Sequence, residues 1–166
     1  MKVVKNILGF IYAIYAMVMF LITMIMVVIP IWFISLLPEP KRAKALHKAF
    51  KIWMGTYMPL IFCPVFRKGK NNFKKNENYV VVINHNSLMD IPVSAPWIPC
   101  PSKTLGKIEM SKIPIFGIIY KTGALLIDRK SEASRRASYS KMEETLAMGI
   151  NLCLYPEGTR NKTDKP

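Results

Sequence analysis

The sequence predicts an α/β protein in which helices flank a mostly parallel sheet, with a membrane-embedded helical segment at the N-terminus. Short runs of apolar, β-favouring residues at 79–83, 123–127 and 150–155 alternate with stretches of helical pattern, an order typical of parallel sheets. Residues 6–38 contain no charged side chain, as expected of a segment in lipid. The predicted parts are a membrane helix or helical hairpin (1–38), a basic amphipathic helix (39–66) and an α/β domain (67–166).

Length and charge restrict the kinds of protein that this chain can be. Its 166 residues have room for one domain with a substantial core. The net charge is +14, and none of the ten acidic residues lies within 41–75, a stretch rich in lysine and arginine. Such a block is expected to face anionic lipid or nucleic acid. Because it follows an apolar span, lipid is the expected partner and nucleic acid is not.

The cysteines and histidines favour neither a disulfide framework nor a zinc site. Cys63, Cys100 and Cys153 are odd in number, widely spaced and set among apolar neighbours. This pattern predicts reduced packing residues in a cytoplasmic domain. With only His47 and His85 and no cysteine pair, no metal is expected.

The segment Ile7–Leu37 is almost continuously apolar and is too long for the core of a signal peptide. As one helix it would measure about 46 Å, against about 30 Å of hydrocarbon. Pro30 is therefore expected to divide it. Two arrangements remain open: a spanning helix over Ile7–Ile29 with an interfacial remainder, or a hairpin that enters and leaves by one face. Lysines at both ends slightly favour the hairpin.

Residues 41–62 have the pattern of an amphipathic helix. Its apolar positions include Trp53 and Tyr57, which suit head-group depth, so the helix is predicted to lie on the membrane surface. The alternative is a helix whose apolar face packs on its own domain. The polar stretch 67–78 is expected to be a linker.

The first predicted strand is Tyr79–Ile83, and its continuous apolar pattern predicts burial on both faces. Six elements are predicted after it. They are a helix from about Leu88 to Pro96, a short strand at 102–105, a helical stretch at 107–120 broken by Pro114 and Gly117, a strand at 123–129 ending in an Asp128–Arg129 ion pair, and a helix at 131–148 opened by Ser131 and closed by Gly149, before the last strand at 150–155.

Polar residues follow each predicted strand, at the sheet edge where α/β proteins place their ligands. His85 comes directly after the first strand, and Asp90 is close enough to fold back and hydrogen-bond its imidazole. A histidine held by a carboxylate can act as a general base. Ser87 lacks the strand-turn-helix context of a nucleophile and is expected to serve in a turn or helix cap.

The other strand ends supply Arg129 and the run 157–160, which contains Glu157, Gly158, Thr159 and Arg160. Two guanidinium groups beside one base suggest recognition of a phosphate, whose geometry arginine matches. Gly158 would let the backbone approach that anion closely.

Three segments resemble the first three motifs of the glycerophospholipid acyltransferases, and most of all the bacterial 1-acyl-sn-glycerol-3-phosphate (lysophosphatidic acid) type. They are 84–90 (NHNSLMD), 123–129 (GALLIDR) and 155–160 (YPEGTR), and 107–117 resembles the family's stretch between the first two. The resemblance covers about 79–160. It implies transfer of a fatty acyl group from acyl-CoA or acyl carrier protein to the sn-2 hydroxyl of lysophosphatidic acid, without a bound cofactor.

In that resemblance, His85 takes the hydroxyl proton while Asp90 orients and charges the imidazole. Arg129, Glu157, Gly158, Thr159 and Arg160 would hold the glycerol phosphate, and Lys107 is a further candidate. The expected partners are membrane lipids, the lysophospholipid acceptor and the acyl thioester donor. The expected location is the inner (cytoplasmic) membrane, with the catalytic domain on the cytoplasmic side.

The family normally continues beyond its third motif, whereas this sequence stops at Pro166. The expectation is therefore a C-terminally truncated chain or a fragment. Two other functions remain open: a membrane-binding module without turnover, and an acyltransferase acting on another lysolipid or on glycerol 3-phosphate.

Overall fold

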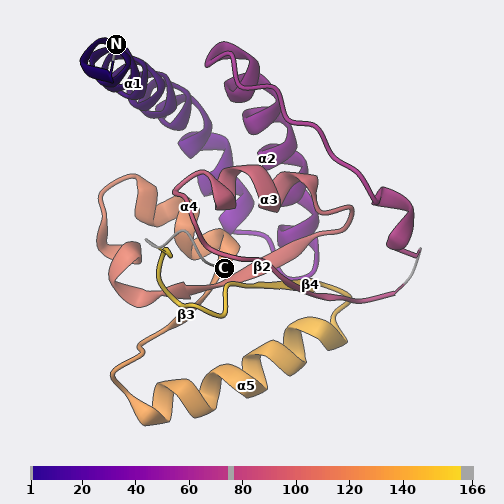
Figure 1. Cartoon of the computed structure of the whole chain (residues 1–166). Coiled ribbons are helices and arrows are strands. Elements are labelled where there is room, and N and C mark those ends of the chain that lie inside the picture. Colours follow the sequence, from indigo (N-terminus) through magenta and orange to yellow (C-terminus); the bar gives the residue numbers. More distant parts are fainter. Residues whose placement is uncertain (1, 75–76, 162–166) are drawn as a thin grey trace.

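A computed structural model of the chain describes residues 2–74 and 77–161, and shows a parallel sheet covered by helices on both faces (Figure 1). The helix α5 lies against one face, and α2, α3 and α4 lie on the other, with α1 outside them. The elements are α1 (Lys2–Ser35), α2 (Lys41–Leu60), η1 (Lys70–Asn72), β1 (Val80–Val82), α3 (Asp90–Trp97), β2 (Ser102–Lys107), η2 (Ile108–Lys112), α4 (Phe116–Gly123), β3 (Ala124–Ile127), α5 (Glu132–Ala147) and β4 (Asn151–Leu154).

The predicted parallel α/β sheet is confirmed, and its strand order is β1-β4-β2-β3. The last strand of the sequence, β4, lies inside the sheet between β1 and β2, and its Leu152 and Cys153 are buried. The prediction that the first strand is buried on both faces is wrong. Strand β1 is a three-residue edge strand. Val80 and Val82 point to the same face and are exposed, because the covering helices pack mainly on β2, β3 and β4.

The apolar N-terminal segment forms one continuous helix, so the predicted division at Pro30, and with it the hairpin, is wrong. A proline removes one backbone hydrogen bond from a helix, but packing can compensate. Ile31, next to Pro30, is fully buried, and this end of α1 packs on α2 and α4. The N-terminal part projects away from the sheet with mostly exposed apolar side chains (Figure 1). Residues Val3–Ser35 are long and apolar enough to cross a membrane.

The apolar face of α2 packs inside the protein, as in the alternative interpretation, and is not available to lie on a membrane surface. Contact of the basic face with lipid stays a prediction. Trp53 and Tyr57 are buried against α1. The indole Nε1 of Trp53 donates to Thr23 Oγ1 at 3.0 Å, and the hydroxyl of Tyr57 donates to the Ala16 carbonyl at 3.2 Å. These polar atoms were expected to meet head groups, but they pair with polar atoms of α1 instead.

A buried ion pair connects the start of α2 to the sheet. The carboxylate of Glu39 accepts hydrogen bonds from Lys103 Nζ at 2.6 Å and Arg42 Nε at 2.8 Å, and also binds the Ala43 N–H. Burial opposes ionisation of Glu39, but the bonds to Lys103 and Arg42 outweigh it and lower its pKa. The helix pair α1–α2 is thereby fixed to β2.

The remaining predicted elements are close to those observed. Strand β2 runs two residues further than predicted, and the helical stretch after it is broken at Pro114, whereas Gly117 lies within α4. Helix α5 begins after Ser131, whose side chain accepts from Ser134 N–H at 3.2 Å, and Gly149 follows with a positive φ. The three cysteines are free, but Cys63 is exposed, so its predicted packing role is wrong.

Candidate active site

The predicted pair of His85 and Asp90 is brought together at the carboxyl end of β1. Nδ1 of His85 lies 2.8 Å from Oδ2 of Asp90, and both side chains are about four-fifths buried. Asp90 is the first residue of α3, so the turn between β1 and α3 folds the carboxylate back onto the imidazole. With Nδ1–H donating to Asp90, Nε2 of the neutral ring is the acceptor, and no described residue hydrogen-bonds it.

The carboxylate oxygen that binds the imidazole also organises the turn. Oδ2 of Asp90 accepts from the backbone N–H groups of Asn86 and Ser87, both at 2.8 Å. Partial burial opposes ionisation, but the bonds from Ser87, His85 and Asn86 outweigh it, so the pKa of Asp90 is lowered. Asp90 is therefore a carboxylate at neutral pH. Ser87 has the expected turn role, since its Oγ accepts from Met89 N–H at 3.1 Å.

Glu157 holds the histidine loop, a role that differs from the predicted phosphate contact. Its Oε1 accepts from the backbone N–H of His85 at 3.2 Å. The backbone N–H of Asn161 donates to the His85 carbonyl at 2.6 Å, so the two sides of the residue are fixed by the loop after β4. A carboxylate repels a phosphate, whereas it accepts well from an N–H group. The structure thus places Glu157 as a positioning residue.

Arg129 reaches from the end of β3 to the same loop, where its Nη1 donates to the carbonyl of Gly158. Gly158 has a φ of +64°, where a residue with a side chain is strained, and a Cβ there would also displace the Arg129 guanidinium. The predicted ion pair of Arg129 with Asp128 does not form. Oδ1 of Asp128 instead accepts from Lys130 N–H at 2.9 Å and closes a turn.

Three further predicted site residues are exposed at the same edge of the sheet, where the strands have their carboxyl ends. Thr159 and Arg160 follow Gly158 on the loop after β4. Lys107 ends β2 and pairs in register with Ile127, two residues before Arg129. Lys107 ends β2, Arg129 follows β3, and Arg160 lies on the loop after β4, so all three belong to the carboxyl edge of the sheet that also carries His85.

Tyr155 packs against the imidazole and is held in place by Ser94; the sequence analysis assigned no role to either residue. The ring of Tyr155 lies 4.7 Å from the His85 ring, centroid to centroid, and the hydroxyl of Tyr155 is 2.8 Å from Ser94 Oγ. Burial raises the pKa of Tyr155, so the phenol stays protonated. The role of Tyr155 could have been inferred from its position directly after β4, at the edge that carries the polar residues. The contact of Ser94 could not, because it depends on how α3 packs.

This arrangement can remove a proton from a substrate group next to an anion. A neutral imidazole with a free Nε2 is a general base, and the Asp90 carboxylate stabilises the imidazolium formed. Within residues 2–74 and 77–161, no cluster of three His, Cys, Asp or Glu side chains suits a metal ion. The nearby cations suit a phosphate.

Comparison with known proteins assigns the chain to a family. A family model described as Acyltransferase matches residues 65–166, more than half of the chain. The chain belongs to the acyltransferase family. The resemblance seen in its motifs is therefore confirmed at the level of the family.

Curated relatives and a solved structure are similar to this acyltransferase-family chain. The 1-acyl-sn-glycerol-3-phosphate acyltransferase of Borreliella burgdorferi is 30% identical over 95 residues, covering 57% of this chain and 38% of that protein. The enzyme of the same name from Helicobacter pylori is 27% identical, covering 75% and 62%. That from Salmonella typhimurium is 29% identical, covering 75% and 51%. The chain thus spans about half the length of the curated relatives it matches.

The crystal structure of the 1-acyl-sn-glycerophosphate (LPA) acyltransferase PlsC from Thermotoga maritima has the same fold. It superimposes with a TM-score of 0.72 at 24% sequence identity, covering 97% of this chain and 64% of that one. The coverage includes α1 and α2, so the acyltransferase-family fold extends over the apolar helix as well as the sheet.

Proposed function

We propose that this chain transfers a fatty acyl group from an acyl thioester to the sn-2 hydroxyl of lysophosphatidic acid, giving phosphatidic acid for phospholipid synthesis. The observation that carries the proposal is the 2.8 Å contact between His85 Nδ1 and Asp90 Oδ2, which leaves Nε2 free to accept a proton. The acceptor is inferred from the names of the relatives, which are 1-acyl-sn-glycerol-3-phosphate acyltransferases.

In the proposed reaction, Nε2 of His85 takes the proton of the acceptor hydroxyl as its oxygen attacks the thioester carbonyl. The tetrahedral intermediate then expels the thiolate, which receives the proton back from the imidazolium. Asp90 stays ionised throughout and stabilises the imidazolium, in agreement with its lowered pKa. The thioester already carries an activated acyl group, so the reaction needs neither a covalent enzyme intermediate nor a bound cofactor.

Arg160, Lys107 and the guanidinium N–H groups of Arg129 that do not bind Gly158 are proposed to hold the glycerol phosphate. Lys107 ends β2, Arg129 follows β3, and Arg160 lies on the loop after β4, which Glu157 joins to His85. A phosphate fixed there would bring the neighbouring glycerol hydroxyl towards the imidazole, which is the positioning that acyl transfer needs. Glu157 contributes by fixing the backbone of His85, and Thr159 is available as a neutral donor.

We place the chain at a membrane, on the cytoplasmic side. The exposed apolar surface of α1 and the net charge of +14 support this, because the cytoplasmic leaflet is anionic. The acceptor and the product are lipids, so a chain held at the bilayer meets both.

The test is an acyl-transfer assay with the full chain in mixed detergent–phospholipid micelles, using lysophosphatidic acid and a long-chain acyl thioester. Loss of a general base lowers kcat by about 100- to 10,000-fold, so His85→Ala is expected to fall in this range. His47→Leu, on α2, is the matched control and should retain activity. Transfer that survives His85→Ala would rule out the mechanism, and circular dichroism of both variants shows whether they are folded.

A further inference from the structure

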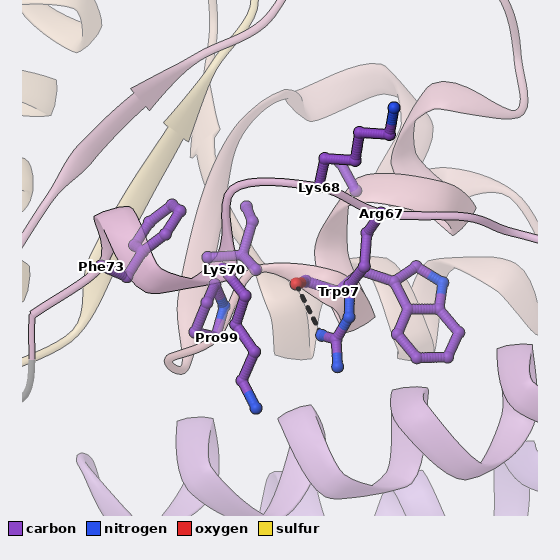
Figure 2. Close-up of a pocket in the computed structure, with 8 residues that line it drawn as sticks. Arg67, Lys68, Lys70, Phe73, Trp97 and Pro99 are labelled. Atoms are coloured by element: carbon purple, nitrogen blue, oxygen red, sulfur yellow. Dashed lines mark hydrogen bonds between the residues drawn. The ribbon is translucent and has the colours of Figure 1, made fainter.

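A cavity of about 160 Å³ lies between the segment that follows α2 and the end of α3 (Figure 2). Arg67, Lys68, Lys70 and Phe73 line it from the first segment. Ser94, Trp97, Ile98 and Pro99 line it from α3 and the turn after it. It is separate from the strand ends that carry the candidate active site, and the proposed mechanism does not use it. All the charged residues of its lining are cations.

The cavity combines a fixed cation with aromatic walls. The guanidinium of Arg67 lies 5.3 Å from the centre of the Trp97 ring, and its Nη1 donates to the Trp97 carbonyl at 3.4 Å. Phe73 lies on the side opposite Trp97 and is itself held edge-on by Tyr79, with 4.9 Å between centroids. In Figure 2 the charged end of Lys68 lies well apart from those of Arg67 and Lys70.

Such a lining suits a flat aromatic ring that carries phosphate groups. Apolar and aromatic walls stabilise a ring by stacking, and arginine and lysine bind phosphate. The volume is below the roughly 300–1,000 Å³ of a pocket that encloses a whole drug-sized ligand. The cavity therefore has room for one ring system, with phosphates at its rim beside Arg67 and Lys70.

Its position relates it to the candidate active site through α3. Ser94 lines the cavity and hydrogen-bonds Tyr155, whose ring packs against His85. From Asp90 to Trp97 the helix rises about 10 Å at 1.5 Å per residue. A ligand bound in the cavity and reacting at His85 must therefore carry its ring and its reactive group at opposite ends of a long arm.

We propose that this cavity binds the nucleotide end of an acyl-CoA donor. The adenine ring lies between Phe73 and the Arg67 guanidinium that covers the Trp97 ring, and the phosphates lie at Arg67 and Lys70. The inference rests on the proposed acyl transfer and adds the identity of the donor. Coenzyme A has a ring and phosphates at one end and its thiol at the end of the pantetheine arm. A carrier protein presents the same arm without an adenine ring, and common lipid head groups have no aromatic ring, so neither uses the aromatic walls.

The first experiment measures binding of adenosine 3′,5′-bisphosphate, the nucleotide probe without the arm, to the full chain in detergent micelles by calorimetry. Arg67→Gln combined with Lys70→Gln is expected to raise Kd at least tenfold. Arg135→Gln combined with Lys141→Gln removes the same two charge types from exposed positions on α5, on the other face of the sheet. This control should change Kd less than twofold, and equal losses in both would reduce the effect to net charge and overturn the proposal.

The second experiment separates the donor site from the proposed function. In the transfer assay, the Arg67/Lys70 variant should raise KM for an acyl-CoA at least tenfold and leave KM for an acyl-pantetheine unchanged. Wild-type transfer with no nucleotide binding would overturn the inference and leave the function standing. Nucleotide binding without transfer from any thioester would overturn the function and leave a nucleotide site.

A third measurement tests the lipid alternative. The same variant is mixed with phosphatidylcholine vesicles and with vesicles containing phosphatidylglycerol. Loss of binding to the anionic vesicles, together with unchanged Kd for the nucleotide, would assign the cavity to a lipid head group and overturn the proposal. Unchanged vesicle binding with weakened nucleotide binding supports it.

Discussion

At the scale of single residues, two carboxylates place the imidazole and its loop. Asp90 accepts from the ring and from two backbone N–H groups, and Glu157 accepts from the backbone of His85. Together, the two carboxylates accept from three backbone N–H groups that have no partner within a regular helix or strand. The two carboxylates thus position the loop and the base, and in the proposed function the nearby cations bind the phosphate.

The other histidine, His47, is expected to make stability depend on pH. It is buried, its Nε2 lacks a partner, and burial followed by the charge of Lys51 lowers its pKa from 6.5 to about 4, against a hydrogen bond with the Ala95 backbone. As pH falls from 6.5 to 4, the unfolded chain binds a proton that the folded chain does not. The contribution of His47 to the free energy of unfolding is therefore fully present above pH 6.5, and about 3 kcal/mol of it is lost by pH 4.

Chemical unfolding of wild type and His47→Leu in detergent at pH 7 and pH 5 measures this effect. The variant should lose much less stability between these pH values, and at pH 7 it should be at least as stable, because a buried unpaired nitrogen has been removed. Equal losses in both proteins would assign the pH dependence to other groups.

At the scale of elements, close packing rather than propensity determines which glycines can be replaced. Gly117 lies in α4, and a Cβ there would collide with the Ser111 carbonyl oxygen of η2. Gly55 lies in α2 and has no atom within 4 Å of an added Cβ. Both are helical glycines, so the difference between them comes from their neighbours.

Alanine is expected to have opposite effects at these two positions. Gly117→Ala should destabilise the chain by about 1–3 kcal/mol, because α4 must move away from η2. Gly55→Ala should stabilise it by about 0.5–1 kcal/mol, because alanine loses less backbone entropy in a helix. Thermal unfolding of both variants measures this, and a shift of the same sign in both would show that packing against η2 does not decide the outcome.

At the scale of the whole molecule, most of the exposed large apolar side chains belong to α1. The C-terminal end of α2 is fixed to α1, since the hydroxyl of Tyr12 donates to the Ile61 carbonyl and that of Tyr15 to the Leu60 carbonyl. Phe62 and Phe66 follow and are 82% and 90% exposed. Phe62 lies beside α1, with 6.5 Å between its ring centroid and that of Tyr15, so it adds to the apolar surface of that helix, and a basic sequence segment follows.

This surface predicts how the chain leaves a membrane. A wash at about 1 M salt shortens the screening length to about 3 Å and weakens the attraction between basic residues and lipid. It leaves the burial of apolar side chains in place, so the chain should stay in the membrane pellet and be released only by detergent. Sedimentation with immunoblotting measures this, and release by salt alone would show that charge is what holds the chain.

The sequence predicted the strands, the two-part helical stretch and the His85–Asp90 pair, because these depend on local pattern and short spacing. It did not predict that Glu157 holds His85 or that Arg129 binds Gly158. Those contacts join residues 72 and 29 positions apart, and they exist only because β4 inserts between β1 and β2. The continuity of α1 past Pro30 and the inward face of α2 were also missed, since each depends on the packing of the other helix.

The sequence alone determined that this chain is an α/β protein with an apolar N-terminal helix, and which residues stand at the ends of its strands. Hydrophobic periodicity and turn residues are local properties, and they can be read without coordinates. Only the tertiary structure decided which strand lies inside the sheet, which polar groups meet there, and that Arg67 and Trp97 border a cavity. Strand order and helix packing are set by non-local burial, and one sequence pattern is compatible with several such arrangements.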